Sequence, residues 1–304
     1  MTADAGSTHH GQVEVSESMR RFGRWQQHGE EGRKWLEALP RVISATCDRW
    51  SLVVDGPPMH GYNSLAVPVR RGNELLVVKA TWPDEQVAEQ VLALRLWHGR
   101  GAVRLVDADV AAGLLLMERL DSTQNLRMRP LDEAVPTIGR LLRSLAIEPP
   151  EGLRTTGGIA ARHRRELPSH WEELGRPMPR RVLDRGLELA EELSTDDYSL
   201  LVNNDLHYEQ VLRRGDGGWS VIDPLIVSGV LEFQTAPLVW TRFDEFGSGG
   251  VRWCVDALAD AAELDRDRAH RWALLRTIEY WLWGLKAGFT EDPVRCGRIV
   301  EALM

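Results

Sequence analysis

The segment SLLVNNDLHYEQVLRRGDGGWSVIDP, residues 199–224, decides the fold of this chain. It contains two or three short apolar runs separated by polar turns, a pattern that predicts short β-strands. Asp205 follows the first apolar run, and Asp223 follows a later one, Val221-Ile222. Two aspartates that each end an apolar run could converge on one site, but aspartate is also common at turns. The spacing alone favours neither interpretation.

The residues around this segment are predicted to be mainly helical. Apolar side chains recur at helix spacing over residues 131–145, 158–174, 180–193, 251–264 and 266–287. The segment 199–224 is therefore expected to be a β-insertion, containing a hairpin, within a large helical region.

The chain before residue 120 has a different pattern. Residues 50–56 (WSLVVDG) and 64–80 (SLAVPVRRGNELLVVKA) read as strands with a turn at Arg71-Gly72-Asn73, and residues 101–120 read as two further strands with a turn at Ala111-Ala112-Gly113. Helix spacing returns over residues 84–97, and an earlier helical region covers residues 20–50, where Pro40 is expected at a helix start. These elements describe a small sheet that carries one helix.

The order of these elements predicts an α+β protein with a two-lobed, protein-kinase-like layout, in which a small β-rich N-lobe precedes a larger helical C-lobe. The expected divisions are a disordered tail at residues 1–18, the N-lobe at 19–119 and the C-lobe at 120–304. The tail is expected because its residues are small, polar and aperiodic.

Composition argues against several kinds of protein. The formal net charge is −8, which is unfavourable for nucleic acid as a partner because phosphate backbones attract basic surfaces. The three cysteines, Cys47, Cys254 and Cys296, are far apart, so neither a disulfide framework nor a zinc site is expected. The N-terminus lacks the features of a secretory signal, and no apolar run reaches the length of a membrane span. We therefore expect a cytoplasmic protein that does not bind membranes.

Lysine is rare in this chain and occurs only at Lys34, Lys79 and Lys286. Lys79 ends the apolar run LLVVK in the predicted N-lobe, where its ammonium could bind nucleotide phosphates. Glu89 on the following helix could pair with the lysine, and Glu85 is a rival for that role. An exposed lysine at a strand end, beside a surface glutamate, is the other interpretation of these residues.

The remaining parts of a phosphoryl-transfer site can also be placed. Such a site needs ligands for magnesium and a carboxylate beside the attacking hydroxyl. Asp205 is the candidate catalytic base in the C-lobe, while the amide oxygen of Gln210 and the carboxylate of Asp223 are candidate ligands for Mg²⁺. The backbone near Glu118, where the predicted lobes join, could bond to an adenine, although a strand running into a linker predicts the same residues.

Candidate residues for binding the acceptor lie further along the chain. Asp244 and Glu245 follow the hairpin, and Glu279 and Trp281 lie on a later predicted helix. Their side chains could line a pocket for a small molecule. A helix surface for the acids and a core position for the tryptophan explain the same residues equally well.

Several long segments resemble the aminoglycoside/hydroxyurea antibiotic phosphotransferases, particularly the branch containing streptomycin 6-phosphotransferases. The segments are WLEALP (35–40), DGPPMHGYNSLAVPVRR (55–71), LRLWHGRGAVRLVDAD (94–109), LLLMERLD (114–121), NDLHYEQVL (204–212), WSVIDP (219–224) and APLVWTRFDEF (236–246). The resemblance runs from about Trp35 to the C-terminus. It implies a two-lobed kinase-like fold and transfer of the ATP γ-phosphate to a hydroxyl of a small molecule, with magnesium. It also implies that the loop Gly61-Tyr62-Asn63-Ser64 covers the phosphates, which adds Ser64 to the nucleotide-binding residues.

The resemblance departs from the family pattern around Asp205. The family's His-Gly-Asp is Asn203-Asn204-Asp205 here, and its metal-binding asparagine is Gln210. Asn204 could replace the glycine because asparagine tolerates positive φ. Gln210 keeps the amide but adds a methylene, and magnesium demands near-ideal octahedral geometry. A further aspartate, which braces the catalytic loop in the family, is Gln234, so a looser loop is expected.

Three functions follow from these residues. The leading prediction is an ATP-dependent O-phosphotransferase that acts on a hydroxyl of a small polar metabolite or an aminoglycoside-like antibiotic. The alternative is a pseudokinase-like module that binds a nucleotide or metabolite and has weakened or lost catalysis, because several amides replace the family's residues. A kinase that modifies a peptide side chain is a third, since the fold does not dictate the acceptor.

Overall fold

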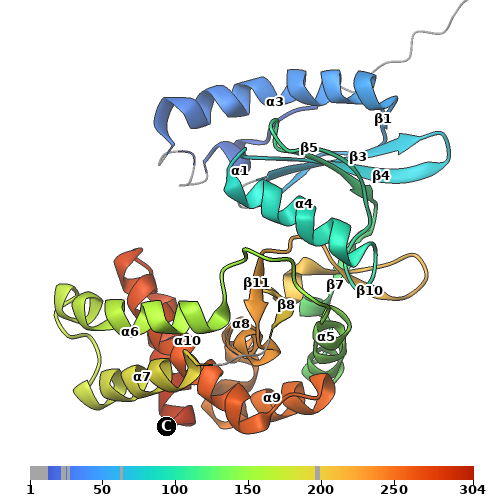
Figure 1. Ribbon diagram of the computed structural model, residues 1–304. Coiled ribbons are helices and arrows are strands. Elements are labelled where there is room, and N and C mark those ends of the chain that lie inside the picture. The colour runs from blue at the N-terminus through green and yellow to red at the C-terminus, as the bar shows by residue number, and fades with distance from the viewer. Residues whose placement is uncertain (1–12, 22–24, 26–27, 62–63, 196–198) are drawn as a thin grey trace, which may run out of the picture. The chain divides into compact units, whose positions relative to one another are not determined.

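The computed structural model describes residues 13–21, 25, 28–61, 64–195 and 199–304, and it divides the chain into two compact units (Figure 1). The first unit comprises Met1–Gly99 and Val103–Leu120, and the second comprises Arg100–Ala102 and Asp121–Met304. Residues 100–102 join the second unit because Ala102 forms a parallel bridge with Val221. The first unit is rich in strands and the second is mainly helical, in the predicted order along the chain.

The first unit is built around one antiparallel sheet with the strand order β1-β3-β4-β6-β5, to which β2 adds through β3. Its elements are α1 (Glu17–Arg20), α3 (Gly29–Trp50), β1 (Val53–Val54), β2 (Met59–His60), β3 (Ser64–Arg71), β4 (Glu74–Thr81), α4 (Glu85–Trp97), β5 (Leu105–Asp109) and β6 (Leu114–Glu118). The β3–β4 turn contains Gly72, whose φ of 58° suits glycine, as the sequence predicts. Helix α4 begins after Asp84, whose side chain accepts a hydrogen bond from the backbone N–H of Gln86 at 3.0 Å.

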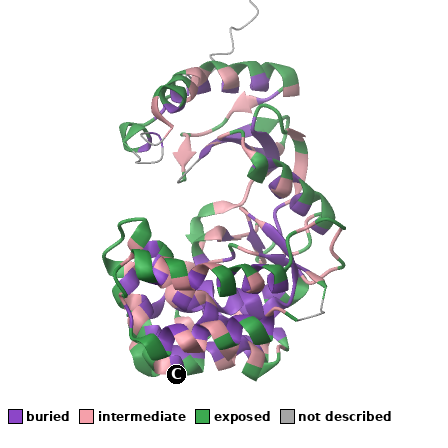
Figure 2. Cartoon of the chain, turned by 60° about the vertical axis from the view of Figure 1, so that its left-hand side comes forward, coloured by how far each residue is buried: buried purple, intermediate pink, exposed green. Residues whose placement is uncertain are grey.

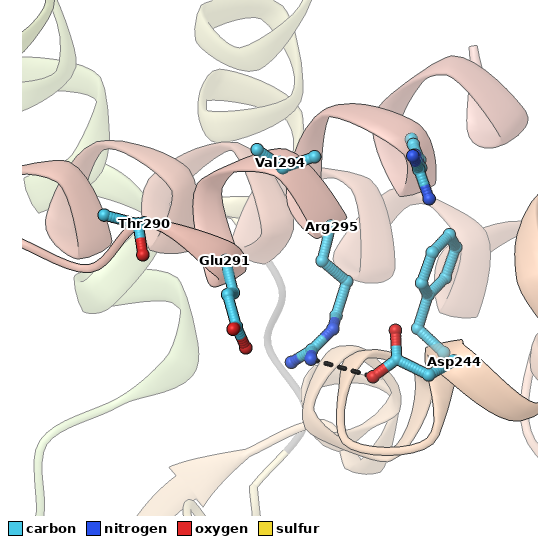
Figure 3. A pocket seen from close by; sticks show the side chains of 7 residues that line it. Asp244, Thr290, Glu291, Val294 and Arg295 are labelled. Atoms are coloured by element: carbon cyan, nitrogen blue, oxygen red, sulfur yellow. Dashed lines mark hydrogen bonds and ion pairs between the residues drawn. The ribbon is translucent and has the colours of Figure 1, made fainter.

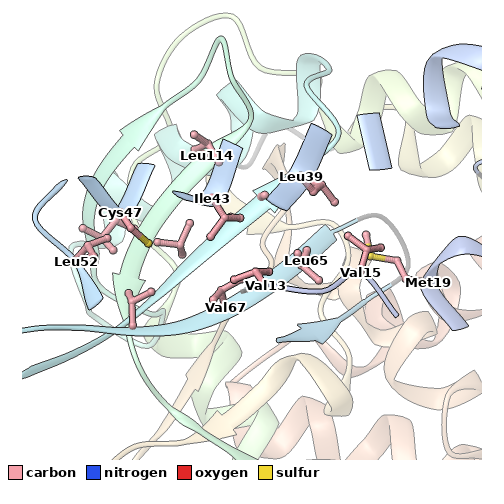
Figure 4. Packing of buried hydrophobic residues seen from close by; sticks show 14 of the residues in the cluster. Val13, Val15, Met19, Leu39, Ile43, Cys47, Leu52, Leu65, Val67 and Leu114 are labelled. Carbon is pink, nitrogen blue, oxygen red and sulfur yellow. The ribbon is translucent and has the colours of Figure 1, made fainter. Parts of the chain in front are cut away.

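The pleat of β4 places the core of this unit on one face of the sheet and Lys79 on the other. Leu76, Val78 and Ala80 point to one face of the sheet and belong to the same buried cluster as Leu39 and Ile43 of α3; Figure 4 shows part of this cluster. Because successive side chains of a strand point to opposite faces, Lys79 lies on the other face, toward α4. The lysine side chain hydrogen-bonds to Gln90 of α4, which confirms that direction.

Two expectations for the N-terminal region are wrong. Pro40 lies inside α3 rather than at a helix start, and the buried face of that helix, which includes Leu39 and Ile43, continues across the proline. Packing of an amphipathic face outweighs the backbone hydrogen bond that proline removes. The tail is also shorter than expected, because Val13 and Val15 are buried in the core of the first unit and α1 begins at Glu17. Residues 1–12 of the predicted tail lie outside the described residues.

The β5–β6 turn fixes the end of β4. It falls at Ala111-Ala112-Gly113, as predicted, and Gly113 has a φ of 69°. Its carbonyl oxygen accepts a hydrogen bond of 2.8 Å from the backbone N–H of Thr81. A Cβ atom at Gly113 would lie only 2.2 Å from the carbonyl oxygen of Thr81, so this contact requires glycine.

The second unit contains most of the helices and two small antiparallel sheets, β10-β9-β7 and β11-β8. Its elements are β7 (Asp121–Asn125), η1 (Leu126–Met128), α5 (Leu131–Ser144), α6 (Thr156–Glu173), α7 (Arg180–Leu193), β8 (Leu200–Asn203), η2 (Tyr208–Gln210), β9 (Val211–Arg213), β10 (Trp219–Val221), β11 (Ile226–Gly229), η3 (Leu231–Gln234), α8 (Thr235–Trp240), α9 (Phe243–Ala262), α10 (Arg266–Lys286) and α11 (Glu291–Leu303). The predicted helices correspond to α5, α6, α7, α9 and α10, whereas α8 and α11 were not predicted.

Helix α10 contacts α6, α7, α8, α9 and α11, and many buried residues lie in the second unit (Figure 2). The N-terminus of α10 is held by Glu232, which is almost fully buried and accepts hydrogen bonds from the backbone N–H of Asp265 at 3.0 Å and from Arg268 at 2.9 Å. None of the helices among the described residues is long and apolar enough to cross a membrane.

Candidate active site

Two antiparallel strand pairs of the second unit, β8–β11 and the hairpin β9–β10, bring Asp205, Gln210 and Asp223 into one place. The end of β8 pairs with the start of β11, Asn203 opposite Ile226, so Asp205 and Asp223 lie beyond the same end of this pair. The start of β9 pairs with the end of β10, and the backbone N–H of Ile222 donates to the carbonyl oxygen of Gln210 at 3.0 Å. The two strand pairs therefore place the predicted catalytic base, Asp205, near the predicted metal ligands Gln210 and Asp223.

Gln210 links the candidate base to the candidate metal site. Its Nε2 atom donates a hydrogen bond to Oδ2 of Asp205 at 3.1 Å, while its Oε1 atom is buried without a hydrogen-bond partner. A buried acceptor without a donor costs free energy unless a ligand or ion satisfies it. Magnesium prefers oxygen ligands, so this oxygen and the nearby carboxylates of Asp205 and Asp223 fit such an ion. No group of three or more His, Cys, Asp or Glu side chains suited to a metal occurs in the described part of the chain.

Asn203 shapes the backbone that precedes Asp205. Its Oδ1 accepts hydrogen bonds from the backbone N–H groups of Asp205 at 3.1 Å and Leu225 at 3.3 Å, whereas its buried Nδ2 has no partner. It thus ties the loop after β8 to the loop before β11. Asn204 donates its backbone N–H to the carbonyl oxygen of Leu225. Asn204 is not among the described non-glycine residues with positive φ, so it does not use the left-handed conformation that asparagine tolerates.

Gln234 braces the same loop from η3. It is fully buried, and its Nε2 donates a hydrogen bond of 3.1 Å to the carbonyl oxygen of Leu206, next to Asp205. Its Oε1 is buried without a partner. The neutral amide therefore retains one direct contact with the loop and leaves one polar atom unsatisfied.

The surroundings of Asp205 shift the pKa of its carboxyl group in opposite directions. Desolvation by the surrounding protein raises the pKa of the Asp205 carboxyl, although the residue itself is exposed, and the Asp223 carboxylate raises this pKa further. His207, the hydrogen bond from Gln210 and the positive charge of Arg276 lower the same pKa. The balance of these effects is a pKa of the Asp205 carboxyl above its ordinary value.

Arg276 of α10 was not identified from the sequence. Its Nη1 donates to the carbonyl oxygen of Phe233 at 3.1 Å, and its guanidinium lies 4.0 Å from the centre of the Phe233 ring. Burial lowers the pKa of Arg276 to about 10, while the charges of Glu279 and Asp205 raise it. Only its position in the fold reveals it, because arginine is common throughout this chain.

Lys79 of the first unit is only 6% exposed, and its Nζ donates a hydrogen bond of 3.1 Å to Oε1 of Gln90. The sequence predicted a carboxylate of the same helix, Glu89, as the partner. Glu89 is half-buried and next to Gln90, so its pairing with Lys79 stays a prediction, whereas the rival Glu85 is exposed. Gln90 was missed because a charged partner was expected, yet its buried position on α4 could have identified it.

The other nucleotide-binding candidates, Ser64 and Glu118, have backbone groups that already form hydrogen bonds within the protein. Ser64 is buried at the start of β3, and its carbonyl oxygen accepts the backbone N–H of Gly61 at 3.0 Å. The loop residues Tyr62 and Asn63 lie outside the described residues. The backbone N–H of Glu118 is already donated to the carbonyl oxygen of Arg104 at 3.0 Å. A contact of this N–H group with adenine would have to replace that bond.

Two of the acceptor candidates make ion pairs. Asp244 lies 3.0 Å from Arg295 and lines a cavity of about 340 Å³ with residues from the start of α11 (Figure 3). Glu245 pairs with Arg242 and, at 3.2 Å, with Arg127, and the hydrogen bond from Arg242 lowers its pKa. Asp244 therefore faces an open space, whereas Glu245 ties the start of α9 to η1.

The remaining two acceptor candidates lie on α10. Burial raises the pKa of Glu279, and the positive charges of Arg276 and Arg162 lower it. Trp281 packs against α11, because a Cβ atom at Gly297 would lie 3.1 Å from its ring. Neither residue lines the cavity beside Asp244, so the four candidates do not form one pocket wall.

Comparison with known proteins gives consistent matches over most of the chain. A hydroxyurea phosphotransferase from Kitasatospora aureofaciens is 35% identical over 298 residues, covering 96% of this chain and 85% of the relative. A streptomycin 6-kinase from Streptomyces griseus is 35% identical over 297 residues, covering 95% of each chain. The family model described as aminoglycoside/hydroxyurea antibiotic resistance kinase matches residues 49–288.

Solved structures with a similar fold are kinases. Aminoglycoside phosphotransferase APH(4)-Ia has a TM-score of 0.60 at 15% identity, covering 86% of this chain and 98% of its own. The choline kinase LicA from Streptococcus pneumoniae has a TM-score of 0.58 at 16% identity, covering 87% and 98%. These matches confirm the predicted kinase-like fold, and the sequence relatives confirm a phosphotransferase with a hydroxyl acceptor. The chain therefore belongs to the aminoglycoside/hydroxyurea antibiotic resistance kinase family.

Proposed function

We propose that this protein transfers the γ-phosphate of ATP to a hydroxyl of a small polar acceptor, either a metabolite or an aminoglycoside-like antibiotic. The observation that carries the proposal is the geometry of Gln210. One end of its amide holds the Asp205 carboxylate at 3.1 Å, and the other end presents a buried oxygen without a partner. An arrangement that joins a base to an unsatisfied oxygen ligand suits phosphoryl transfer.

Asp205 is the catalytic base in this proposal. Its carboxylate accepts the proton of the acceptor hydroxyl, and its other neighbours hold it in position for that step. Asn203 anchors the backbone N–H of Asp205, and Gln234 anchors the carbonyl oxygen of Leu206, so the loop is held on both sides of the base. Gln210 orients the carboxylate through its Nε2 atom.

Gln210 and Asp223 would hold a magnesium ion through their side-chain oxygens. When bound, the ion supplies positive charge that neutralises the phosphate oxygens. Lys79 of the first unit binds the nucleotide phosphates, and Gln90, together with the predicted partner Glu89, directs its ammonium. Ser64 and Glu118 complete the predicted nucleotide contacts. We place the protein in the cytoplasm, which the three free cysteines support.

The test is turnover of ATP with magnesium in the presence of streptomycin, hydroxyurea and simple polyols, followed by mass spectrometry of the acceptor. Asp205→Asn should lower turnover by a factor of about 10² to 10⁴, because the base is lost. The affinity for ATP should change little. Asp216→Asn is the matched control, since Asp216 lies in the exposed turn between β9 and β10. Full activity of Asp205→Asn would contradict the proposal.

A second candidate is a nucleotide-binding protein with weakened catalysis. Two buried amide atoms beside Asp205, Nδ2 of Asn203 at the end of β8 and Oε1 of Gln234 on η3, lack partners and favour this candidate. It predicts that ATP binds with magnesium but that no acceptor is phosphorylated. Restoration of turnover by Gln210→Asn together with Asn203→His would support it, whereas turnover by the unmodified protein would exclude it.

A further inference from the structure

The turn η3 is held on α10 by buried contacts. It also contacts β8, the strand that leads to Asp205. The ring of Phe233 meets the ring of Trp272 of α10 edge-on, with 5.0 Å between the ring centres, and both residues are at most 1% exposed. Glu232 of the same turn binds the first residues of α10. The position of η3 is therefore set by α10.

The last residue of this turn, Gln234, reaches the loop that carries Asp205. Its Nε2 donates a hydrogen bond of 3.1 Å to the carbonyl oxygen of Leu206, the residue after Asp205, whereas its Oε1 is buried without a partner. Only one end of the amide is therefore held. The direction of the amide depends on the backbone that carries it, because no second hydrogen bond fixes its plane.

Arg276 of α10 fixes that backbone. Its guanidinium lies 4.0 Å from the centre of the Phe233 ring and 5.7 Å from that of Trp240. Its Nη1 donates a hydrogen bond of 3.1 Å to the carbonyl oxygen of Phe233. This carbonyl belongs to the same planar peptide group as the backbone nitrogen of Gln234, so a bond to the oxygen restricts the orientation of the whole group. Arg276 thus acts on the backbone immediately before the Gln234 side chain.

Stability alone does not account for an arginine at this position. Burial lowers the pKa of Arg276 to about 10, because removal of water disfavours the charged form. Within the described part of the chain, its guanidinium forms no ion pair with a carboxylate. A buried charge without such a partner contributes less to stability than a well-packed apolar side chain of similar volume. A role in the candidate active site explains the arginine better.

We propose that Arg276 is a positioning residue for phosphoryl transfer. It fixes the peptide group before Gln234, and Gln234 then holds the loop that carries Asp205. The inference rests on the proposed function and extends it to a residue of α10 that acts through this loop, not on the reacting atoms. A small displacement of a catalytic group lowers the rate of the chemical step without weakening the binding of substrates. Loss of the guanidinium should therefore lower kcat and leave KM unchanged.

The test is a double-mutant cycle between Arg276 and Gln234. Turnover is measured with ATP, magnesium and whichever of streptomycin, hydroxyurea and simple polyols is phosphorylated. Arg276→Met and Gln234→Leu should each lower kcat about tenfold and leave the KM values for ATP and the acceptor within about twofold of wild type. Because both residues act through one contact, the double variant should also lose about tenfold. A loss of about 100-fold, which independent residues would give, would overturn the inference.

Two further variants separate positioning from charge and from general effects on α10. Arg276→Lys keeps the positive charge, but its compact ammonium cannot reproduce the flat stacking and the in-plane donor of arginine. Its kcat should stay about fivefold or more below wild type, and full activity of this variant would contradict the inference. Arg271→Met is the matched control, because Arg271 lies on the same helix, has a side chain that is 40% exposed and pairs with Glu192 of α7. It should leave kcat unchanged.

Hydrogen exchange followed by mass spectrometry measures the loop itself, without turnover. Arg276→Met should raise exchange in peptides that cover residues 203–210 and leave exchange in α4 of the first unit as in wild type. If Arg276→Met does not fold, Arg276→Lys replaces it in the cycle and in this measurement. A uniform increase in exchange, or no increase, would overturn the inference and leave the proposed function standing. If the wild-type protein phosphorylates no acceptor, the proposed function and this inference fall together.

Discussion

Replacement of His163 should make the stability of this protein less sensitive to acid. His163 lies on α6, and its side chain is only 5% exposed. Burial is the main cause that lowers its pKa from 6.5 to about 3, and the nearby charges of Arg162, Arg276 and His170 contribute to the same shift. The folded protein therefore keeps this imidazole neutral under conditions in which the unfolded chain protonates it.

The sign and size of the effect follow from proton linkage. Below about pH 6.5 the unfolded state binds a proton at His163 that the folded state excludes. The contribution of neutral His163 to the free energy of unfolding is therefore fully present above that pH and is lost as the pH falls toward 3. Each unit by which the pH falls in this window lowers the free energy of unfolding by at most about 1.4 kcal/mol. Between pH 6.5 and 4.5 the free energy of unfolding should therefore fall by about 2–3 kcal/mol through this residue.

Urea unfolding, followed by tryptophan fluorescence between pH 7.5 and 4.5, measures this effect. The wild-type protein should lose about 2–3 kcal/mol more than His163→Gln over the acidic part of the range. Contributions from carboxylates cancel in the difference between the two proteins. His98→Asn, which replaces an exposed histidine, should follow the wild-type curve. Parallel curves for His163→Gln and wild type would refute the reasoning.

Three further substitutions test the fold and the nucleotide site. Gly113→Ala places a Cβ 2.2 Å from a carbonyl oxygen and should lower the free energy of unfolding by about 2–4 kcal/mol. Gly72 also has positive φ but has open space around it, so Gly72→Ala should lower this free energy by only about 1 kcal/mol. Similar losses of stability in the two variants would refute the steric argument. Glu232→Gln weakens a buried ion pair and the start of α10, so it should cost about 3 kcal/mol in thermal or urea unfolding, and a cost below 1 kcal/mol would contradict that role. Gln90→Leu removes a hydrogen bond to a buried lysine and should raise the KM for ATP about tenfold without changing the KM for the acceptor. Gln86→Leu on the exposed face of the same helix should leave both values unchanged, and an equal response of the two variants would exclude a specific role for Gln90.

Local signals in the sequence were sufficient for most elements of the fold. Helix α4 was predicted to within one residue because Asp84 provides a capping side chain and the apolar spacing is regular. The turns at Gly72 and Gly113 were predicted because both require a conformation that favours glycine. Pro40 misled the prediction of α3, because local propensity does not include the tertiary packing of Leu39 and Ile43.

The candidate site was only partly predictable. The positions of Asp205 and Asp223 after apolar runs made them candidates, and antiparallel pairing of the strands brings them and Gln210 close together. The direction of the Gln210 amide could not be foreseen, because it depends on the position of the Asp205 side chain. Arg276 approaches from a helix far along the chain, and no local pattern distinguishes it from other arginines.

The scarcity of lysine makes this protein suited to chemical footprinting. Lys34 and Lys286 lie on the surface with side chains that are 71% and 59% exposed, whereas Lys79 is 6% exposed. An amine-reactive reagent therefore has three side-chain targets, and two of them modify readily whatever the protein binds. Peptide mapping of the third then reports occupancy around β4 directly, with the other two lysines serving as internal standards within the same molecule.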